Sequence, residues 1–174
     1  ERAMKFEILG FFSDSTFAGQ VGEDGPEFKS SNNGTTIVPS ANMVRPVRDN
    51  LWFGWTVLGS GFSEDYGDGW AGRHFIEEYD LISISAFPSL AMKVNEKFSV
   101  AASLAITYTT YDQVKAVPNV DPGFDDGTLK ASTDGWSVGW ALSGLYEFSE
   151  QTRAGLSYRS KIEPDLDGKA KFSG

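Results

Sequence analysis

Bulky apolar side chains recur at every second position along much of this chain of 174 residues. The clearest example runs from Phe98 to Tyr108, where apolar residues alternate with small or hydroxylated ones. The apolar row consists of Phe98, Val100, Ala102, Leu104, Ile106 and Tyr108. Successive side chains of a strand point to opposite faces, so a period of two predicts a strand with one bulky and one partly polar face. No segment keeps a helical period over three turns, and the chain is predicted to be all-β.

About seven strands are predicted from this alternation. They lie at about residues 3–12, 35–47, 51–62, 79–94, 97–112, 134–148 and 153–163. Several reach the length of about ten residues that a tilted strand needs to cross a bilayer. Pro39 and Pro46 fall within the second range, although proline cannot donate to a β-ladder and is usually confined to edges and bulges.

Short and long connections alternate strictly between these predicted strands. The short ones are tight polar turns at residues 48–50, 95–97 and 149–152, and the long ones are polar loops at about residues 13–33, 63–77 and 113–133. Outer-membrane barrels have short periplasmic turns and long extracellular loops, whereas a soluble β-sandwich has no reason to lengthen every second connection. Residues 1–174 are therefore predicted to form part of an antiparallel up-and-down transmembrane β-barrel.

Composition supports this class and argues against others. The chain has 19 Gly and 14% aromatic residues, a balance expected of strands that face lipid on one side and a lumen on the other. Aromatic residues also gather near the predicted strand ends, as in the interfacial girdle of a barrel, although ordinary core aromatics give the same clustering. The net charge of −9 argues against a nucleic-acid partner. The absence of cysteine excludes disulfides and thiolate metal sites.

Catalytic and metal-binding patterns are weak. His74, the only histidine, stands beside Arg73 in a predicted loop without a nucleophile signature, so we interpret it as a solvated residue and not a base. Two groups of loop carboxylates lack the spacing of a calcium-binding loop and are also interpreted as solvated. They are Glu64, Asp65 and Asp68, followed by Asp121, Asp125 and Asp126. We expect no enzyme activity, no cofactor and no metal site.

Several segments resemble a known family when they are taken in order along the chain. They are residues 65–73 (Asp-Tyr-Gly-Asp-Gly-Trp-Ala-Gly-Arg), 88–100, 136–140, 145–150 and 152–162. Over about residues 35–170 they resemble the FadL/TodX (OMPP1) family of outer-membrane transport proteins. The resemblance implies a barrel of 14 strands in the Gram-negative outer membrane. Such a barrel takes up long-chain fatty acids or aromatic hydrocarbons passively and releases them sideways near an inwardly kinked third strand.

The chain departs from that family pattern in two ways. The N-terminal hatch with its Asn-Pro-Ala motif is absent, since the chain opens directly on a predicted strand, and about seven of the expected 14 strands are present. We therefore expect an N-terminal half-barrel without the hatch. Its two sheet edges would carry unpaired backbone groups, which need a missing half, a second copy or edge-to-edge assembly.

Ligand contacts are expected in the third long loop. The resemblance places a basic contact near Lys115, and Val117, Phe124 and Leu129 in the same loop supply apolar surface. A fatty-acid carboxylate that leaves water must be paired with a cation. An exposed lysine on a solvated loop is the alternative interpretation.

Further candidates lie on two predicted strands. By strand parity, Arg159 and Lys161 are predicted to face the lumen and form the second set of ligand contacts. Gly54, Gly59 and Gly61 belong to the third predicted strand, where glycine suits a bend or a close backbone approach. In a FadL-like barrel this strand borders the lateral exit, so these glycines are candidates for its kink. A plain loop entry would also place glycines there.

Passive outer-membrane transport of a hydrophobic small molecule is the favoured function, with membrane lipid and lipopolysaccharide around the barrel. Two other hypotheses stay open. One is a structural, self-assembling β-sheet protein whose strand edges join chains into an oligomer or filament. The other is a soluble lipocalin-like carrier, an up-and-down barrel that holds one ligand.

Overall fold

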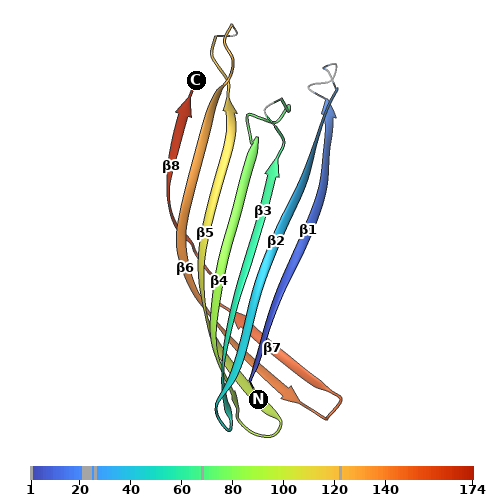
Figure 1. Cartoon of the computed structure of the whole chain (residues 1–174), viewed down its shortest axis with the longest axis vertical. Coiled ribbons are helices and arrows are strands. Elements are labelled where there is room, and N and C mark those ends of the chain that lie inside the picture. The colour runs from blue at the N-terminus through green and yellow to red at the C-terminus, as the bar shows by residue number, and fades with distance from the viewer. Residues whose placement is uncertain (1, 21–24, 26, 68, 122) are drawn as a thin grey trace.

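The computed structural model describes residues 2–20, 25, 27–67, 69–121 and 123–174 (Figure 1). They form one antiparallel sheet of eight strands. The strands are β1 (Ala3–Gln20), β2 (Glu27–Arg48), β3 (Leu51–Asp65), β4 (Glu78–Lys93), β5 (Phe98–Val117), β6 (Gly127–Glu147), β7 (Arg153–Arg159) and β8 (Asp165–Ser173). Within these ranges no helix is long and apolar enough to cross a membrane.

Neighbouring strands follow one another along the chain from β1 to β7, and β8 lies beside β6. β7 pairs with residues 141–147 of β6, and β8 pairs with residues 128–136 of the same strand. Between these two paired stretches, residues 160–164 stand opposite residues 137–140 of β6. This side of the sheet has one residue more than β6 over the same length, which makes it a β-bulge. β7 and β8 thus act as one interrupted strand, and the sheet is seven strands wide.

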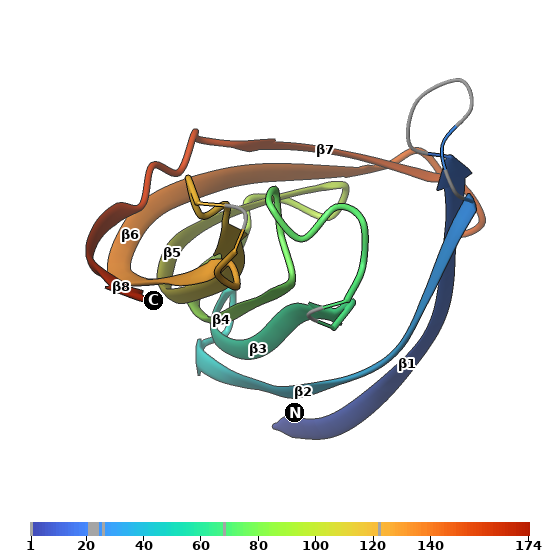
Figure 2. The ribbon, with the colours of Figure 1, turned by 90° about the horizontal axis from the view of Figure 1, so that it is seen from above.

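The sheet is strongly curved, as Figure 2 shows. Arg159 of β7 and Phe87 of β4 have two strands between them, yet the guanidinium carbon lies 5.8 Å from the centroid of the Phe87 ring. The face that carries both side chains is therefore the concave one. Tight turns close one end of the sheet, between β2 and β3, β4 and β5, and β6 and β7 (Figure 1). We call this the turn end, and the opposite end, where the longer connections lie, the cap end.

The convex face carries a band of exposed apolar side chains. On β5 this band is the row from Phe98 to Tyr108 that the alternation predicts, and Leu104 in its middle is 51% exposed. Leu104 stands directly opposite Trp140 of β6. Other exposed members of the band are Met4, Phe6, Ile8, Phe12, Ile82, Ile84, Leu90, Trp136, Val138, Leu142, Leu156 and Tyr158. The bulky row therefore faces outward and does not pack into a core.

An aromatic pair and a charged row mark the border of this band at the cap end. The rings of Tyr108 and Trp136 pack with their centroids 5.0 Å apart. Asp80 and Asp112 follow on the same face and are direct cross-strand partners of β4 and β5. A girdle of amphipathic rings followed by charge is typical of the interface between hydrocarbon and water.

The concave face is lined by small and hydroxylated side chains. Cross-strand hydroxyl pairs join β4 to β5 along this face: Ser83–Thr109 at 2.9 Å, Ser85–Thr107 at 2.8 Å and Ser89–Ser103 at 2.7 Å. Ala105 and Ser137 on the same face are only 2% and 5% exposed. This face carries the small row that the alternation predicts.

The strands reach further into the predicted long loops than the alternation indicates. They also cover residues 13–20, 27–33, 63–65, 113–117 and 127–133. Polar pairs such as Thr16 and Ser31 continue the ladder there without any bulky row, so backbone pairing persists where the apolar signal ends. Residues 21–24, 26, 68 and 122 of these predicted loops lie outside the described residues.

The alternation also misses β8. Its residues Asp165–Ser173 do alternate, but the outward row consists of Asp165, Asp167, Lys169 and Lys171. A strand with charge in place of its bulky row gives no apolar signal, although its backbone pairs normally with β6.

Candidate functional site

The connection between β3 and β4 lies inside the curve of the sheet at the cap end (Figure 2). We call its described part, residues 66, 67 and 69–77, the cap. Backbone bonds from the Ala116 N–H to the Arg73 carbonyl (2.9 Å) and from the Glu77 N–H to the Val114 carbonyl (2.8 Å) attach the cap to β5. This connection is therefore an ordered part of the concave side and not a free loop.

Trp70 attaches the cap to the opposite side of the sheet. Its ring stacks on Tyr66, with 4.6 Å between centroids, and meets Phe17 of β1 edge-on at 5.7 Å. The indole N–H donates a hydrogen bond of 2.6 Å to the Ile76 carbonyl. The cap therefore spans the concave face from β5 to β1.

An ion pair joins the cap to the connection between β5 and β6. Arg73 Nε donates to Asp126 Oδ2 at 2.9 Å, and His74 Nε2 lies 3.7 Å from the same oxygen. The Arg73 guanidinium beside Asp126 holds the pKa of that carboxyl below its usual value. The interpretation of Asp126 as a merely solvated loop residue is therefore wrong.

Three of the predicted ligand contacts come together on the concave face near the cap. Lys115 stands directly opposite Leu129 in the ladder between β5 and β6, and Val117 stands opposite Gly127. Lys115, Val117 and Leu129 are half-buried, and among the described residues the Lys115 ammonium forms no ion pair. Phe124 does not join them, because it lies in the connection after β5 and is 70% exposed.

The second predicted set is divided by the bulge between β7 and β8. Arg159 lies on the concave face, where its guanidinium stands over the Phe87 ring. Lys161 is exposed and pairs with the Glu163 carboxylate. A Cβ on the concave-face residue Gly139 would meet Ile162 Cγ1, so the residue after Lys161 covers this face. The predicted lumen position of Lys161 is wrong because regular alternation ends with β7 at Arg159.

The boundary between β2 and β3 is paired along only part of its length. Backbone pairs run between residues 40–48 of β2 and residues 51–58 of β3 and stop there. β2 stays paired with β1 as far as Glu27, and β3 stays paired with β4 as far as Asp65. Pro39, the next residue of β2, has no N–H to continue the ladder. Figure 1 shows β1 and β2 leaning away from β3 and β4 toward the cap end.

We call the unpaired stretch, residues 30–39 of β2 beside residues 59–65 of β3, the seam. The strands remain in contact at its lower limit, where a Cβ on Gly59 would lie 2.9 Å from Pro39 Cδ. A cavity of about 280 Å³ lies in the seam. It is lined by Thr35, Thr36, Ile37, Pro39, Gly59, Ser60, Gly61, Phe62, Ser63, Asp80, Ile82, Ser83 and Ile84.

The glycines predicted to kink the third strand have two different positions. Gly59 and Gly61 border the cavity in the seam. Gly54 lies in the paired part, opposite Val44 on one side and Ser89 on the other. Because β3 pairs with β4 through all three glycines in one register, the discontinuity is a lost ladder beside β3.

Side chains cross the seam at the cap end. Asn32 Nδ2 donates to Glu64 Oε2 at 2.7 Å, and Ser30 Oγ donates to the Tyr66 carbonyl at 3.2 Å. Asn32 and Glu64 are only 6% and 4% exposed. Hydrogen bonding to Glu64, with burial as the second cause, raises the pKa of Tyr66 to about 12.

Sequence reasoning missed both members of the Asn32–Glu64 pair. Asn32 falls in a predicted loop, and the interpretation of Glu64 as a solvated loop carboxylate is wrong. The alternation of β3 continues through Phe62 to Glu64, which share the concave face. If the predicted strand is extended by two residues beyond Phe62, the same alternation places the Glu64 carboxylate on the concave face.

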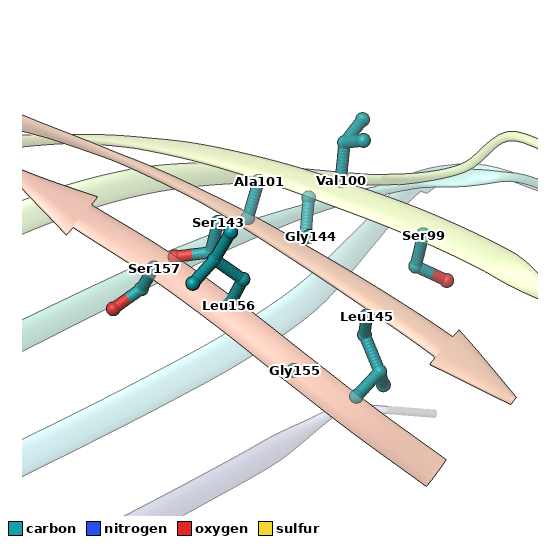
Figure 3. A pocket seen from close by; sticks show the side chains of 10 residues that line it. Ser99, Val100, Ala101, Ser143, Gly144, Leu145, Gly155, Leu156 and Ser157 are labelled. Atoms are coloured by element: carbon teal, nitrogen blue, oxygen red, sulfur yellow. The ribbon is translucent and has the colours of Figure 1, made fainter.

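Toward the turn end the concave face forms a shallow trough of small side chains (Figure 3). The cavity there measures about 370 Å³ and is lined by Ala91, Ser99, Val100, Ala101, Ser143, Gly144, Leu145, Gly155, Leu156 and Ser157. Figure 3 shows Ser99 and Leu145 on the side opposite to Val100, which belongs to the convex row. Small residues therefore leave space along the inner face beyond the cap.

Some of the loop carboxylates stabilise turns, and those in the described ranges do not gather as metal ligands. No group of three or more His, Asp or Glu side chains lies together there. Asp65 accepts the Gly67 N–H at 2.9 Å, and Asp121 accepts the Gly123 N–H at 3.1 Å. Asp68 of the first acidic group lies outside the described residues.

Comparison with known proteins gives consistent matches. Residues 10–174 match the family model described as outer membrane protein transport protein (OMPP1/FadL/TodX). The long-chain fatty acid transport protein of Escherichia coli O6:H1 is 24% identical over 160 residues, which cover 80% of this chain and 36% of that protein. Outer membrane protein P1 of Haemophilus influenzae is 24% identical over 165 residues, which cover 79% of this chain and 36% of that protein. The chain thus spans about a third of the length of these relatives.

A solved structure has the same fold. The crystal structure of a Pseudomonas aeruginosa FadL homologue superposes with a TM-score of 0.68 at 19% identity, over 92% of this chain and 43% of that chain. The fold class predicted from the alternation, an antiparallel barrel of which this chain forms a part, is confirmed.

Proposed function

This chain belongs to the OMPP1/FadL/TodX family of outer membrane transport proteins, and on that basis we propose that it forms one side of a channel for hydrophobic molecules. The convex face then lies against lipid and lipopolysaccharide of the Gram-negative outer membrane, and the concave face lines the channel. The turn end lies on the periplasmic side and the cap on the extracellular side, as in other outer-membrane barrels. Transport through such a channel is passive.

The opposite character of the two faces is the single observation that supports this function best. Leu104 and Val138 on the convex face are 51% and 66% exposed, whereas hydroxyl pairs such as Ser85–Thr107 line the concave face. A broad exposed apolar band is unfavourable in water and favourable in lipid. A soluble carrier would instead turn its bulky row inward.

Long-chain fatty acids are the ligands that fit best, with aromatic hydrocarbons as the other class. Lys115 beneath the cap is the proposed cation for a carboxylate, and Val117 and Leu129 beside it contact the hydrocarbon chain. Arg159, further along the concave face, receives the carboxylate next. Phe124, exposed in the connection after β5, is an outer apolar contact.

Sideways release through the seam completes the proposed path. The cavity of about 280 Å³ reaches from concave-face residues such as Phe62 and Ser83 to convex-face residues such as Ile82. Gly59 and Gly61 allow the strand to pass close to its neighbours there. Gly54 has no part in this exit, because it lies in the paired half of the boundary.

Uptake of a radiolabelled long-chain fatty acid by cells that express the full-length protein tests this function. We expect Lys115→Ala combined with Arg159→Ala to lower uptake about tenfold or more, because both charge-assisted contacts to the carboxylate are lost. Lys130→Ala is the control, since Lys130 is exposed on the convex face of the same ladder. Unchanged uptake by the double variant at normal surface expression would exclude these residues as carboxylate contacts. Equal uptake with and without the protein would exclude the transport function.

The outer edges of the sheet favour self-assembly as a second candidate. In the described structure β1 pairs only with β2, and β7 and β8 pair only with β6. Each edge therefore has N–H and C=O groups that are costly in lipid unless another strand pairs with them. Further strands of the same barrel are the partners we favour, and second copies of this chain are the alternative. A clean monomer of the isolated chain in mild detergent would exclude self-assembly.

A further inference from the structure

We propose that the bond between Asn32 and Glu64 is a latch that holds the seam closed, and that its loss favours opening of the barrel wall there. The proposal rests on sideways release through the seam, which is part of the proposed function. It adds the device that controls the opening and assigns it to two residues.

Opening at the seam requires no rupture of the β-ladder. On the cap side of Ser40 and Leu58 the two strands form no backbone pair, while each stays bonded to its other neighbour. At the cap end, described contacts between these two parts of the sheet all involve a side chain: Asn32–Glu64, Ser30–Tyr66 and Phe17–Trp70. The two parts can therefore separate at the cap end while every strand keeps its ladder.

The latch bond is short and buried. Asn32 Nδ2 and Glu64 Oε2 are 2.7 Å apart, and the residues are 6% and 4% exposed. A buried carboxylate that loses its donor is strongly disfavoured, so the bond favours the closed wall. Ser30 Oγ holds the Tyr66 carbonyl from β2, so both strands contribute to the closed arrangement.

The cavity of the seam lies directly below the latch. Ser63 lines the cavity and precedes Glu64, while the contact between Pro39 and Gly59 forms the lower limit. Below that limit the backbone ladder begins. Separation at the latch thus widens the cavity most at the cap end and least at Pro39 and Gly59. It brings the concave face into contact with lipid.

Distance measurement between spin labels in the intact protein, reconstituted in lipid, tests the latch. The chain has no cysteine of its own, so Thr35→Cys with Ser63→Cys places one label on each side of the seam. Ala41→Cys with Val57→Cys is the matched control, because these residues are direct partners in the paired half of the same boundary. We expect Glu64→Ala to raise the population of long distances across the seam about tenfold or more, and to leave the control pair unchanged.

Two further variants keep the test decisive if Glu64→Ala does not fold. Glu64→Gln retains an acceptor for the Asn32 amide, so it should keep the parent distances. Asn32→Leu keeps the size of the side chain but has no donor for the Glu64 carboxylate, so it should open the seam as Glu64→Ala does. Parent-like distances across the seam in Asn32→Leu, or equal widening of the control pair, would overturn the latch.

Uptake by the same variants separates the latch from the proposed function. If the seam widens and uptake of the labelled fatty acid changes with it, both proposals are supported. If the seam widens while uptake stays at the parent level, the latch stands and sideways release is wrong. If the seam does not widen, the latch is wrong whatever the uptake.

Discussion

Two boundaries of the same sheet are held together in different ways. β5 and β6 pair without interruption from Phe98–Tyr146 to Val117–Gly127. β2 and β3 pair only toward the turn end, and their other halves meet through side-chain contacts, among them the latch formed by Asn32 and Glu64. A ladder resists separation through many backbone bonds at once, whereas a side-chain bond can be lost alone. The sheet therefore combines a rigid boundary with one that can open.

The difference has a simple origin in the amino-acid sequence. β5 and β6 contain no proline, so every residue of both strands can donate to a ladder. β2 carries Pro39 at the point where its pairing with β3 ends, and β3 carries Gly59 beside it. Pro39 and Gly59, which lie side by side, thus mark the point where backbone pairing between β2 and β3 gives way to side-chain contacts.

The largest effect is expected from a proline in the continuous boundary. Thr107 lies between Ser85 of β4 and Ser137 of β6, so Thr107→Pro removes a backbone donor from the interior of the sheet and puts a proline ring where a neighbouring strand packs. We expect a loss of about 3 kcal/mol in the free energy of unfolding, measured by denaturant titration in detergent. Thr107→Ala, which shortens the side chain but keeps the backbone N–H, is the control. Pro39→Ala should change stability by less than about 1 kcal/mol, and similar losses at both sites would refute the contrast between the boundaries.

A smaller effect is expected from filling the contact at the lower limit of the seam. A Cβ on Gly59 would lie 2.9 Å from Pro39 Cδ, so Gly59→Ala should cost about 1–3 kcal/mol of unfolding free energy. Gly144→Ala in β6 is the control, because its Cβ would meet the Phe98 ring at an ordinary 3.6 Å. Adding Pro39→Ala to Gly59→Ala should recover part of the loss. If the double variant is no more stable than Gly59→Ala, the close contact is not the cause.

Two asparagines compare the two halves of the β2–β3 boundary directly. Asn32 bonds to the buried Glu64 carboxylate in the seam, whereas Asn42 accepts from Thr56 at 2.9 Å in the paired half. We expect Asn32→Ala to cost about 1.5–3 kcal/mol, because it leaves a buried charge without its donor, and Asn42→Ala about 0.5–1.5 kcal/mol. Denaturant titration of both variants measures the difference. The reverse order of the two losses would mean that the latch does not stabilise the closed seam.

The smallest effect is expected at the ion pair that attaches the cap to the connection after β5. Arg73 holds the pKa of Asp126 below its ordinary value of 3.8, so the bond is fully present above that pH and is lost as the pH falls through the lowered pKa. We expect the cap to loosen only in that acid range, seen as a change in Trp70 environment by fluorescence. Asp126→Asn should remove most of this step. A parent-like step in Asp126→Asn would assign it to another group.

Much of the sheet could be predicted because its two faces differ in chemistry. In the row from Phe98 to Tyr108 each second residue is apolar, and the structure places that row on the convex face. Arg159 was placed correctly on the concave face by the same parity. Alternation does not predict a strand that lacks an apolar row, as in β8. Strand parity does not predict the face of a residue that follows a bulge, as at Lys161.

The seam was only partly accessible from the sequence. Pro39, Gly59 and Gly61 are local features that indicate an irregular strand, and they do border the seam. The bond between Asn32 and Glu64 joins residues far apart in sequence on strands that do not pair there, so no local pattern contains it. The cap was missed for the same reason, since its attachment to Phe17 and Ala116 depends on the curvature of the whole sheet.

The neighbouring carboxylates of Asp80 and Asp112 have a consequence for how deeply the protein sits in the bilayer. They are direct partners on the convex face, two residues beyond the pair Ile82–Thr110. Like charges side by side are tolerated only while both stay hydrated, so submerging this row in hydrocarbon is strongly unfavourable. The immersion depth therefore has a fixed upper limit on this side. That limit also sets the height at which a molecule leaving through the seam first meets the acyl chains.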